Sequence, residues 1–414
     1  MQGCRRLFRW INNHIETATI RNITKELEKK ENDYKIEESY CSEYQENIDY
    51  SNYQTEIKTI TFYLPQFHTF PENDAWWGKG FTEWTNTRKA LPRFEGHYQP
   101  RIPHRDIGYY DLSQEKAIER QIKLAKQHKI YGFCFYYYWF SGKRLMEKPL
   151  DIFLRHPEWD IKFCLCWANE NFTRTWTGSA DNILIEQKYE DEDPEKFITS
   201  LKKYIEDDRY IRVNGKPVII IYNMGAIPKV RETIHKWRNS ARQEGIGEIE
   251  IWMCQTNATN ARLLHLMNEI DAEVEFPPHN MWWKPIHENV QREDNEKIYN
   301  YRKLVDIMVY RIQNSKKERK KPLYHTCMLG WDNSCRRENG WTLYHGFTIS
   351  KFKEWVDALV EDVRKNQAED KRYIFVNAWN EWGEGTYLEP DEKYGYTNIN
   401  VLSQCICKKQ EQRR

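Results

Sequence analysis

From Lys58 onward, short apolar runs alternate with longer stretches in which apolar residues recur every three or four positions. The short runs are rich in β-branched and aromatic residues and predict strands, whereas the longer stretches predict amphipathic helices. The runs that fit the strand pattern are Lys58–Leu64, Ile130–Tyr137, Ile161–Trp167, Pro217–Tyr222, Glu248–Cys254, Ala272–Phe276, Leu323–Met328 and Arg372–Ala378. Because parallel strands need a crossover helix between them, this alternation predicts an α/β protein with a (β/α)8 TIM-barrel fold.

Two of the helical stretches show their pattern most clearly. Asp193 and Pro194 match a helix N-cap followed by proline at the first helical position. The apolar stripe behind them consists of Phe197, Ile198, Leu201, Tyr204 and Ile205. A second stripe, just before the last predicted strand, consists of Phe352, Trp355, Val356, Leu359, Val360 and Val363. Both stripes predict helices that cover a sheet.

The two ends of the chain lack this alternation. Residues 1–56 are polar and charged and predict a flexible or helical N-terminal extension. Within them, residues 5–15 have the spacing of a short amphipathic helix, so contact with a membrane surface or a partner is an alternative to a loosely attached tail. We therefore predict three parts: the extension 1–56, a catalytic barrel 57–402, and a basic C-terminal tail 403–414.

Charge and composition narrow the class of protein. The chain carries 63 Lys and Arg against 62 Asp and Glu, so no global field would recruit nucleic acid. No apolar run is long enough to form a transmembrane segment, and the first residues lack the apolar core of a signal peptide. Several cysteines lie inside predicted strands, where cysteine is usually a small buried apolar residue: Cys134, Cys164, Cys166, Cys254 and Cys327. Together these features predict a reduced, cytoplasmic protein.

No residue pattern predicts a metal or a cofactor. The cysteine and histidine spacings lack the second half of a zinc pattern, and neither a P-loop nor a dinucleotide glycine motif is present. Asp191 and Asp193 match the Asp-x-Asp with which many sugar-nucleotide transferases hold a divalent metal. Their position directly before a helix that starts with proline favours N-capping instead.

Polar and aromatic side chains follow most of the predicted strands. In a (β/α)8 barrel the active site lies at the carboxyl ends of the strands, so these side chains are expected to converge there. They include Gln66, His68, Tyr138, Trp139, Asn169, Glu170, Arg174, Trp176, Glu275, His279 and Trp331.

The segment Asn377–Pro390, with the sequence NAWNEWGEGTYLEP, carries the clearest chemistry. It follows the last predicted strand and places Glu381 and Glu384 three residues apart beside tryptophans. Glycoside chemistry uses two such carboxylates, one to protonate the departing oxygen and one to assist attack on the sugar. The alternative is a glycine-rich turn with solvated acids. We expect Glu381 and Glu384 to be the catalytic pair.

Aromatic residues make up 14% of the chain, and many stand in polar contexts that suit the flat face of a sugar. Trp84 and Trp176 are candidate stacking platforms. Tyr136 and Tyr138 fall on one side of their strand, which we expect to face the barrel interior. The other candidate substrate-binding residues are Tyr63, Trp167, Asn380 and Trp382.

Structural roles remain alternatives for several of these residues. Glu170 has an ion pair with Arg174 as its alternative, and about half of the aromatic rings are expected to be ordinary core. His68 and Glu275 are as consistent with structural as with functional roles. Glu83, in GFTEWTN, is a less definite candidate.

The longest motifs resemble one family. FYLPQFH, ENDAWWGKGFTEWTN, YGFCFYYYWFSGKRL, CLCWANENFTR, VEFPPH and NEWGEGTYLEPDEKYGY look like the WbsX-type family of bacterial surface-polysaccharide proteins. That family is often labelled glycosyltransferase, yet it is related to the glycoside hydrolases of family 99. The resemblance covers roughly Thr59 to Asn398.

Family 99 enzymes are (β/α)8 barrels that cleave α-mannosidic linkages internally, with retention and without a metal. The resemblance implies that Glu381 acts as a base toward the sugar's own 2-hydroxyl, giving an anhydro-sugar intermediate. It implies that Glu384 is the acid/base at the leaving group. Gly383 stands where we expect a bulkier residue in the mannosidases, and its missing side chain is expected to open a subsite.

These observations predict a retaining, endo-acting α-mannosidase-like hydrolase or transglycosidase. Its expected partner is an oligo- or polysaccharide: a bacterial surface polysaccharide, such as lipopolysaccharide O-antigen or capsule, or its precursor. The alternatives are a sugar-nucleotide glycosyltransferase of polysaccharide biosynthesis and a non-catalytic carbohydrate-binding barrel.

Overall fold

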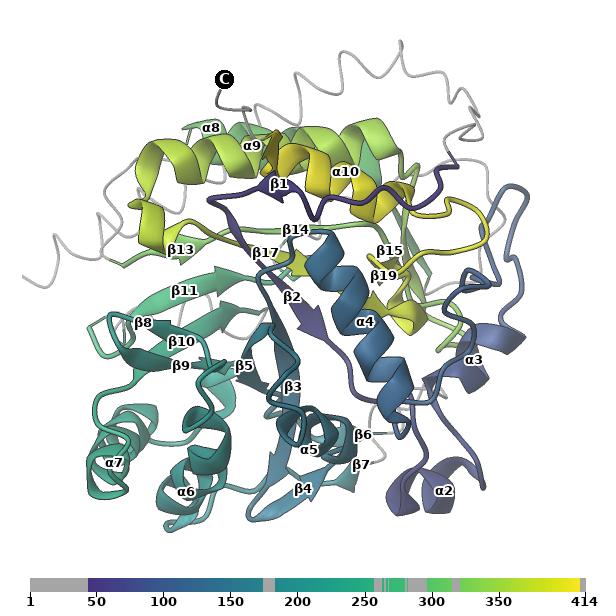
Figure 1. Ribbon diagram of the computed structural model, residues 1–414. Helices are drawn as coiled ribbons and strands as arrows, with labels where there is room; N and C mark the ends of the chain where they lie inside the picture. The colour runs from purple at the N-terminus through teal and green to yellow at the C-terminus, as the bar shows by residue number, and fades with distance from the viewer. Residues whose placement is uncertain are drawn as a thin grey trace, which may run out of the picture.

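The computed structural model describes residues 44–173, 183–256, 263, 266, 268–279, 281, 296–314 and 321–409. Within them, parallel strands follow one another around a barrel in chain order (Figure 1). They are β2 (Lys58–Tyr63), β3 (Gly132–Phe140), β5 (Lys162–Trp167), β9 (Lys216–Ile221), β10 (Glu250–Gln255), β11 (Ala272–Glu275), β13 (Leu323–Tyr324) with β14 (Thr326–Met328), and β17 (Tyr373–Asn377). Pairing of β17 with β2 closes the ring, which confirms the predicted (β/α)8 fold.

The seventh strand is interrupted at His325. β13 pairs with β11 on one side, and β14 pairs with β17 on the other. The backbone N–H of Phe375 donates to the His325 carbonyl at 3.0 Å, so the ladder continues through the interruption. β13 and β14 are therefore the two halves of the single predicted strand Leu323–Met328.

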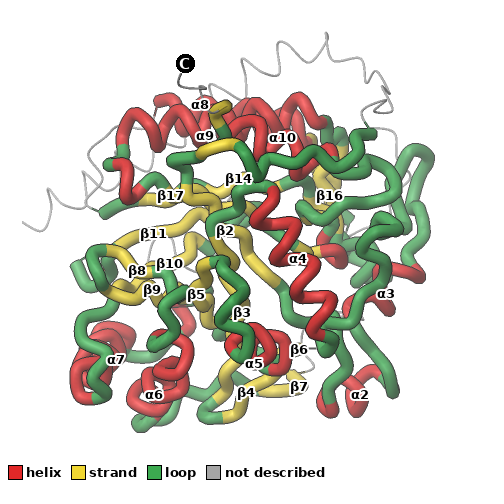
Figure 2. The backbone as a smooth tube through the Cα atoms, in the orientation of Figure 1, coloured by secondary structure: helices red, strands yellow, loops and turns green. Residues whose placement is uncertain are grey.

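Helices cover the outside of the barrel between successive strands (Figure 2). They are α4 (Glu115–Gln127), α5 (Lys148–Leu154), α6 (Asp193–Ile205), α7 (Val230–Gln243), α8 (Tyr301–Asn314) and α9 (Ile349–Asn366). The predicted apolar stripes of α6 and α9 are both buried. Burying a large aliphatic or aromatic side chain contributes about 1.5–3 kcal/mol, so these stripes fix the helices on the barrel.

The start of α6 differs in detail from the prediction. The N-cap position is Glu192, without a side-chain cap, and Asp193 is the first helical residue. Asp193 Oδ2 instead accepts hydrogen bonds from the Ser141 hydroxyl at 2.7 Å and from the Glu190 backbone N–H at 2.9 Å. The predicted N-capping role is wrong, because this carboxylate ties the turn after β3 to the loop before α6.

The barrel interior is a packed core and not a channel. Phe62 meets Phe276 and Phe375, with ring centroids 4.8 and 5.6 Å away. The cysteines of the predicted strands are all buried free thiols, as expected. The site must therefore lie above this core, at one end of the strands.

Both ends of the described chain pack against the rest of the protein. β1 (Tyr53–Gln54) pairs with β20 (Lys408–Lys409), and Tyr50 is buried. α10 (Thr397–Ile406) is buried along most of its length, and the Asn400 side-chain amide donates to the Glu46 carbonyl at 2.9 Å. Residues 44–56 and 403–409 thus belong to the folded unit, because each supplies the other's backbone and side-chain partners. Residues 5–15 lie outside the described part of the chain.

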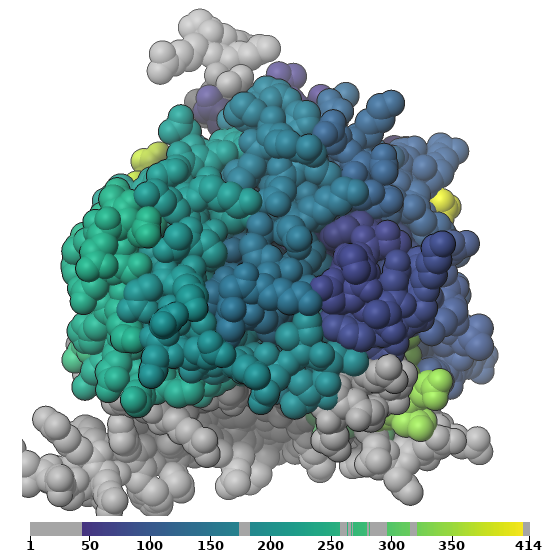
Figure 3. Space-filling view, turned by 90° about the horizontal axis from the view of Figure 1, so that it is seen from below, coloured from purple at the N-terminus to yellow at the C-terminus, as the bar shows by residue number. Residues whose placement is uncertain are grey.

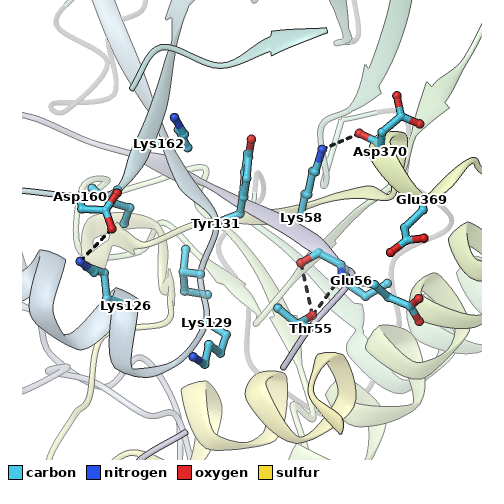
Figure 4. A pocket seen from close by; sticks show the side chains of 13 residues that line it. Thr55, Glu56, Lys58, Lys126, Lys129, Tyr131, Asp160, Lys162, Glu369 and Asp370 are labelled. Atoms are coloured by element: carbon cyan, nitrogen blue, oxygen red, sulfur yellow. Dashed lines mark hydrogen bonds and ion pairs between the residues drawn. The ribbon is translucent and has the colours of Figure 1, made fainter. Parts of the chain in front are cut away.

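A hollow of about 830 Å³ lies at the amino ends of the strands (Figure 4). Lys58 Nζ donates to the Asp370 backbone carbonyl at 2.5 Å, and Lys126 forms an ion pair with Asp160 at 3.3 Å. Other lysines around it bind the backbone carbonyls of Ser51 and Asp208. These contacts join the elements that surround the hollow.

Among the described helices, none is long and apolar enough to cross a membrane.

Candidate active site

The chain after β17 forms a tight unit at the carboxyl end of the barrel. β18 (Asn380–Glu381) and β19 (Thr386–Tyr387) pair around the 3-10 turn η6 (Trp382–Glu384). The Asn380 side chain accepts from the Leu64 backbone N–H at 2.8 Å and donates to the Leu64 carbonyl at 3.0 Å. These two hydrogen bonds to the end of β2 anchor the unit, so that Glu381 and Glu384 are held in place.

Both glutamates bind one guanidinium. Arg336 Nη1 donates to Glu384 Oε1 at 2.6 Å, and Arg336 Nη2 donates to Glu381 Oε2 at 3.2 Å. Arg336 stands in the turn after β15 (Trp331–Asp332). The structure thus brings the predicted catalytic pair together, with a cation between the two carboxylates.

A third carboxylate completes the cluster. Glu83 is the first residue of α3 (Glu83–Lys89), and its Oε1 accepts from Arg336 Nε at 2.8 Å. Its side chain is fully buried. Burial raises the pKa of Glu83, and the guanidinium of Arg336 opposes this shift.

Burial dominates the electrostatics of the cluster. It raises the pKa of Glu381 well above its ordinary value, and repulsion from Glu384 raises it further. Burial also raises the pKa of Glu384. Arg336 opposes both shifts, and Glu83 reinforces both. A carboxyl group with a raised pKa keeps its proton nearer to neutral pH, which a general acid requires.

Tyrosines surround the pair. Tyr136 and Tyr138 lie on the same side of β3, with ring centroids 6.4 Å apart, as the period-two pattern predicts. The pKa of each phenol is raised, mainly by burial and then by the charge of Glu381. Tyr222, just after β9, has a raised pKa through burial and through the charges of Glu170 and Glu384.

Several tryptophans among the predicted substrate-binding residues are buried. Trp84 donates its indole N–H to the Tyr110 carbonyl at 2.8 Å, and Trp382 is fully buried and stacks on Tyr387 at 3.8 Å. Trp139 and Trp167 face the helix layer, where both rings pack against Phe197 of α6. These rings support the site from behind.

Polar candidates show the same pattern. Tyr63 donates its hydroxyl to Gln121 on α4 at 2.6 Å, away from the glutamates. Asn169 binds the backbone N–H and carbonyl of Asn223, both at 2.8 Å. Asn380 is saturated by Leu64, as described above. The Gln121 side chain, in the case of Tyr63, and the backbone, in the case of Asn169 and Asn380, take the hydrogen bonds expected for a sugar hydroxyl.

The remaining candidates lie around the rim or beneath it. His68 Nδ1 binds the Pro65 carbonyl at 2.8 Å, and Gln66 is buried. Glu275 pairs with His325 at 2.9 Å, and Trp331 is buried in β15.

The candidates His279 and Glu170 bind Tyr222 and its neighbour Asn223. The Tyr222 hydroxyl binds His279 Nε2 at 2.9 Å, and burial lowers the pKa of His279 to about 4. Glu170 Oε1 accepts from the Asn223 side-chain amide at 3.0 Å. Arg174 and Trp176 lie outside the described residues, so the proposed Glu170–Arg174 ion pair does too.

From below, the surface beside α2 (Pro71–Trp77) is contributed largely by the first half of the chain (Figure 3).

The expectation of a subsite at Gly383 is wrong. A Cβ at this position would lie 1.8 Å from Glu83 Oε1 and 2.5 Å from Arg336 Nε. The space that a side chain would fill is occupied by this ion pair.

Sequence reasoning missed Arg336 and the buried Glu389. Arg336 lies five residues after the candidate Trp331, so extending the search along the turn that follows the seventh predicted strand would have found it. Glu389 accepts from the Trp382 indole N–H and the Tyr110 hydroxyl, at 2.8 and 2.7 Å. The sequence pattern around Glu389 points less clearly to a buried role, because a single acid after a hairpin is usually exposed.

The metal alternative gains no support from the described side chains. Among them, no group of three or more His, Cys, Asp or Glu residues could hold a metal ion. Asp193, the second acid of the Asp-x-Asp motif, is committed to Ser141 and Glu190.

Solved structures share the (β/α)8-barrel fold of this chain. A solved structure described as a glycoside hydrolase-like protein matches 89% of this chain and 98% of its own, with a TM-score of 0.54 and 14% identity. The family 99 endo-α-mannosidase of Bacteroides thetaiotaomicron matches 83% of this chain and 95% of its own, with a TM-score of 0.48 and 14% identity.

Residues 59–402 match the family model described as glycosyltransferase WbsX, and the chain belongs to this family. The protein WxcX of Xanthomonas campestris pv. campestris is 38% identical over 352 residues, or 84% of this chain. That match spans only 49% of WxcX, so the chain spans about half the length of the curated relatives it matches.

Proposed function

We propose that this protein is a retaining carbohydrate-active enzyme that cleaves or transfers glycans, with Glu381 and Glu384 as its catalytic pair. The observation that carries the proposal is the position of these two carboxylates on one guanidinium, at the carboxyl end of the barrel. Membership of the WbsX family supports a bacterial surface polysaccharide, or its precursor, as the substrate.

The reaction follows the course that the family 99 resemblance implies. Glu381 takes the proton of the sugar 2-hydroxyl as O2 attacks C1, and the glycosidic C1–O bond breaks. Glu384 gives its proton to the departing oxygen. Water or an acceptor hydroxyl then attacks C1 and returns a proton to Glu384, while O2 recovers its proton from Glu381 as the anhydro ring opens. Two inversions at C1 leave its configuration unchanged.

The raised pKa values suit a pair that shares one proton, and the family 99 resemblance assigns that proton to Glu384. Glu384 must be protonated and Glu381 ionised at the start of the reaction. Burial raises the pKa of Glu381 more than that of Glu384, and repulsion between the two carboxylates favours the state in which the pair holds one proton. The neighbouring hydroxyls of Tyr138 and Tyr222 are candidate contacts for sugar oxygens.

The family description favours one second candidate, a sugar-nucleotide glycosyltransferase. Thermal-shift measurements distinguish the glycosidase-like enzyme from the glycosyltransferase, by comparing stabilisation by α-mannosides with stabilisation by nucleotide sugars plus Mn²⁺. Stabilisation by the nucleotide sugars alone would contradict the glycosidase-like proposal. A non-catalytic barrel would bind glycans equally well in the wild type and in variants of both glutamates.

The direct test is an NMR-followed incubation with defined α-mannooligosaccharides. We expect cleavage or transfer that gives an α-anomer and that falls about 10²–10⁴-fold in Glu384→Gln. Glu369→Gln is the matched control, because Glu369 is exposed at the opposite end of the barrel (Figure 4). Equal activity of Glu384→Gln and the wild type would overturn the assignment.

A further inference from the structure

One guanidinium joins carboxylates from separate parts of the chain. Arg336 comes from the turn after β15, Glu83 from the start of α3, and the catalytic pair from the segment after β17. The exposed fractions of the side chains are 15% for Arg336, 0% for Glu83, 6% for Glu381 and 24% for Glu384. The cluster therefore lies largely out of water, where ion pairs act strongly.

The geometry assigns a different task to each partner of Arg336. Glu83 binds Nε at 2.8 Å, on the side edge of the guanidinium. Because the guanidinium is planar and rigid, fixing this edge also fixes the directions of the two terminal nitrogens. Those nitrogens meet Glu384 at 2.6 Å and Glu381 at 3.2 Å. An anchor on one edge thus orients the donors on the other.

Local packing fixes the positions of Arg336 and the catalytic pair relative to each other. Cys335, next to Arg336, donates its thiol to the Gly383 carbonyl at 3.2 Å. Gly383 lies between the two catalytic glutamates in sequence, and its missing side chain gives Glu83 and Arg336 their space. The turn after β15 and the turn η6 are therefore built against each other.

We propose that Glu83 and Arg336 are positioning residues of the active site, in which Glu83 fixes the guanidinium and the guanidinium orients and charge-balances Glu381 and Glu384. This inference rests on the proposed function, since it assigns supporting roles for that reaction. Each catalytic carboxylate gives one oxygen to Arg336, Oε1 of Glu384 and Oε2 of Glu381, which leaves its second oxygen for the sugar.

The two positioning residues have opposite electrostatic effects. The cation of Arg336 lowers the pKa values of the pair, and the anion of Glu83 raises them. The other charged or titratable groups that act on the pair are Arg337, Tyr136, Tyr138 and Tyr222. Removing Arg336 or Glu83 should therefore shift the titration of the pair in opposite directions.

The test is a carboxyl titration that needs no substrate. Protein labelled with ¹³C at the glutamate side-chain carboxyl is titrated by NMR, and the pair is assigned by the resonances lost in Glu381→Gln and Glu384→Gln. Arg336→Gln is expected to raise the midpoints by about one pH unit or more, and Glu83→Gln is expected to lower them. Arg155→Gln, a change at an exposed arginine, is the control and should leave them unchanged.

A merely structural role predicts a different result. If either substitution only loosened the site, water would enter in both variants and both would move the midpoints downward. Shifts of the same sign, or none, would overturn the proposal. Arg336→Lys tests the same point with the charge retained. The titration midpoints of Arg336→Lys should lie nearer to the wild-type midpoints than the midpoints of Arg336→Gln do. Turnover should fall, because lysine cannot bind all three carboxylates as the guanidinium does.

The titration and the activity assay can fail separately. Opposite shifts in a protein that cleaves no α-mannoside would keep the positioning roles and remove the proposed reaction. Cleavage by a wild type whose variants titrate alike would keep the reaction and remove the positioning roles. Circular dichroism of each variant checks that the barrel is folded.

Discussion

The carboxylate of Glu83 occupies the space into which a side chain at Gly383 would extend. A Cβ at Gly383 would lie 1.8 Å from Glu83 Oε1. Glycine at this position is therefore required by a residue 300 positions away in the sequence. The contact links the first turn of α3 to the turn that carries the catalytic pair, and it makes the two glutamates depend on the packing of α3.

Gly383→Ala is expected to lower the free energy of unfolding by about 1–3 kcal/mol, because the methyl group displaces Glu83 or Arg336. In Glu83→Ala the obstructing carboxylate is gone, so the same change should cost less. A double-mutant cycle by denaturant unfolding measures the difference, which we expect to be about 0.5 kcal/mol or more. Additive effects would show that the two residues do not compete for this space.

Asn380→Ala is expected to destabilise the fold, because it leaves both the N–H and the carbonyl of Leu64 without their partner. The loss should be about 1–3 kcal/mol, measured by chemical denaturation. Asn52→Ala, at an exposed asparagine, serves as the control. An Asn380→Ala protein of unchanged stability would favour the sequence-based interpretation of this amide as a sugar ligand.

The stability of the protein should depend on pH through Glu389. Burial raises its pKa from 4.5 to about 7, so the folded state holds this proton more tightly than the unfolded state. Its contribution to stability is therefore largest below pH 4.5 and is lost as the pH rises through 7, a change of roughly 3 kcal/mol.

The measurement is the unfolding free energy of the wild type minus that of Glu389→Gln, taken at pH 4 and at pH 8. This difference should fall by about the stated amount between the two pH values, since the amide cannot ionise. Glu369→Gln, at an exposed acid, should show no such change. A constant difference for Glu389→Gln would mean that the pKa of Glu389 is the same in the folded and unfolded states.

The rate of the proposed reaction should follow a bell-shaped pH profile. Activity needs Glu381 ionised and Glu384 protonated, and both have raised pKa values, so the optimum should lie nearer to neutral pH than for exposed carboxyl groups. In Glu83→Gln both limbs of the kcat/KM profile should move to lower pH, because one negative charge is removed. An upward move would contradict the arrangement of charges.

Much of the fold is readable from the chain because the signals are local. The spacing of apolar residues located the barrel strands to within a few residues, including the strand that His325 divides. The segment NAWNEWGEGTYLEP likewise marked Glu381 and Glu384, since both residues of the proposed catalytic pair lie in one short stretch of sequence. The position of the pair at the carboxyl end of the barrel followed from the barrel prediction alone.

The sequence by itself determined which turn carries the two glutamates and on what kind of scaffold it stands. Only the tertiary structure decided what surrounds them. It placed Trp382, Asn380 and Tyr63 in the core, and it filled the space at Gly383 with Glu83 and Arg336. Periodicity records which face of one element is buried, whereas the partner of a buried polar group depends on elements far apart in the chain. For that reason the guanidinium that joins the carboxylates could not be read from any single segment.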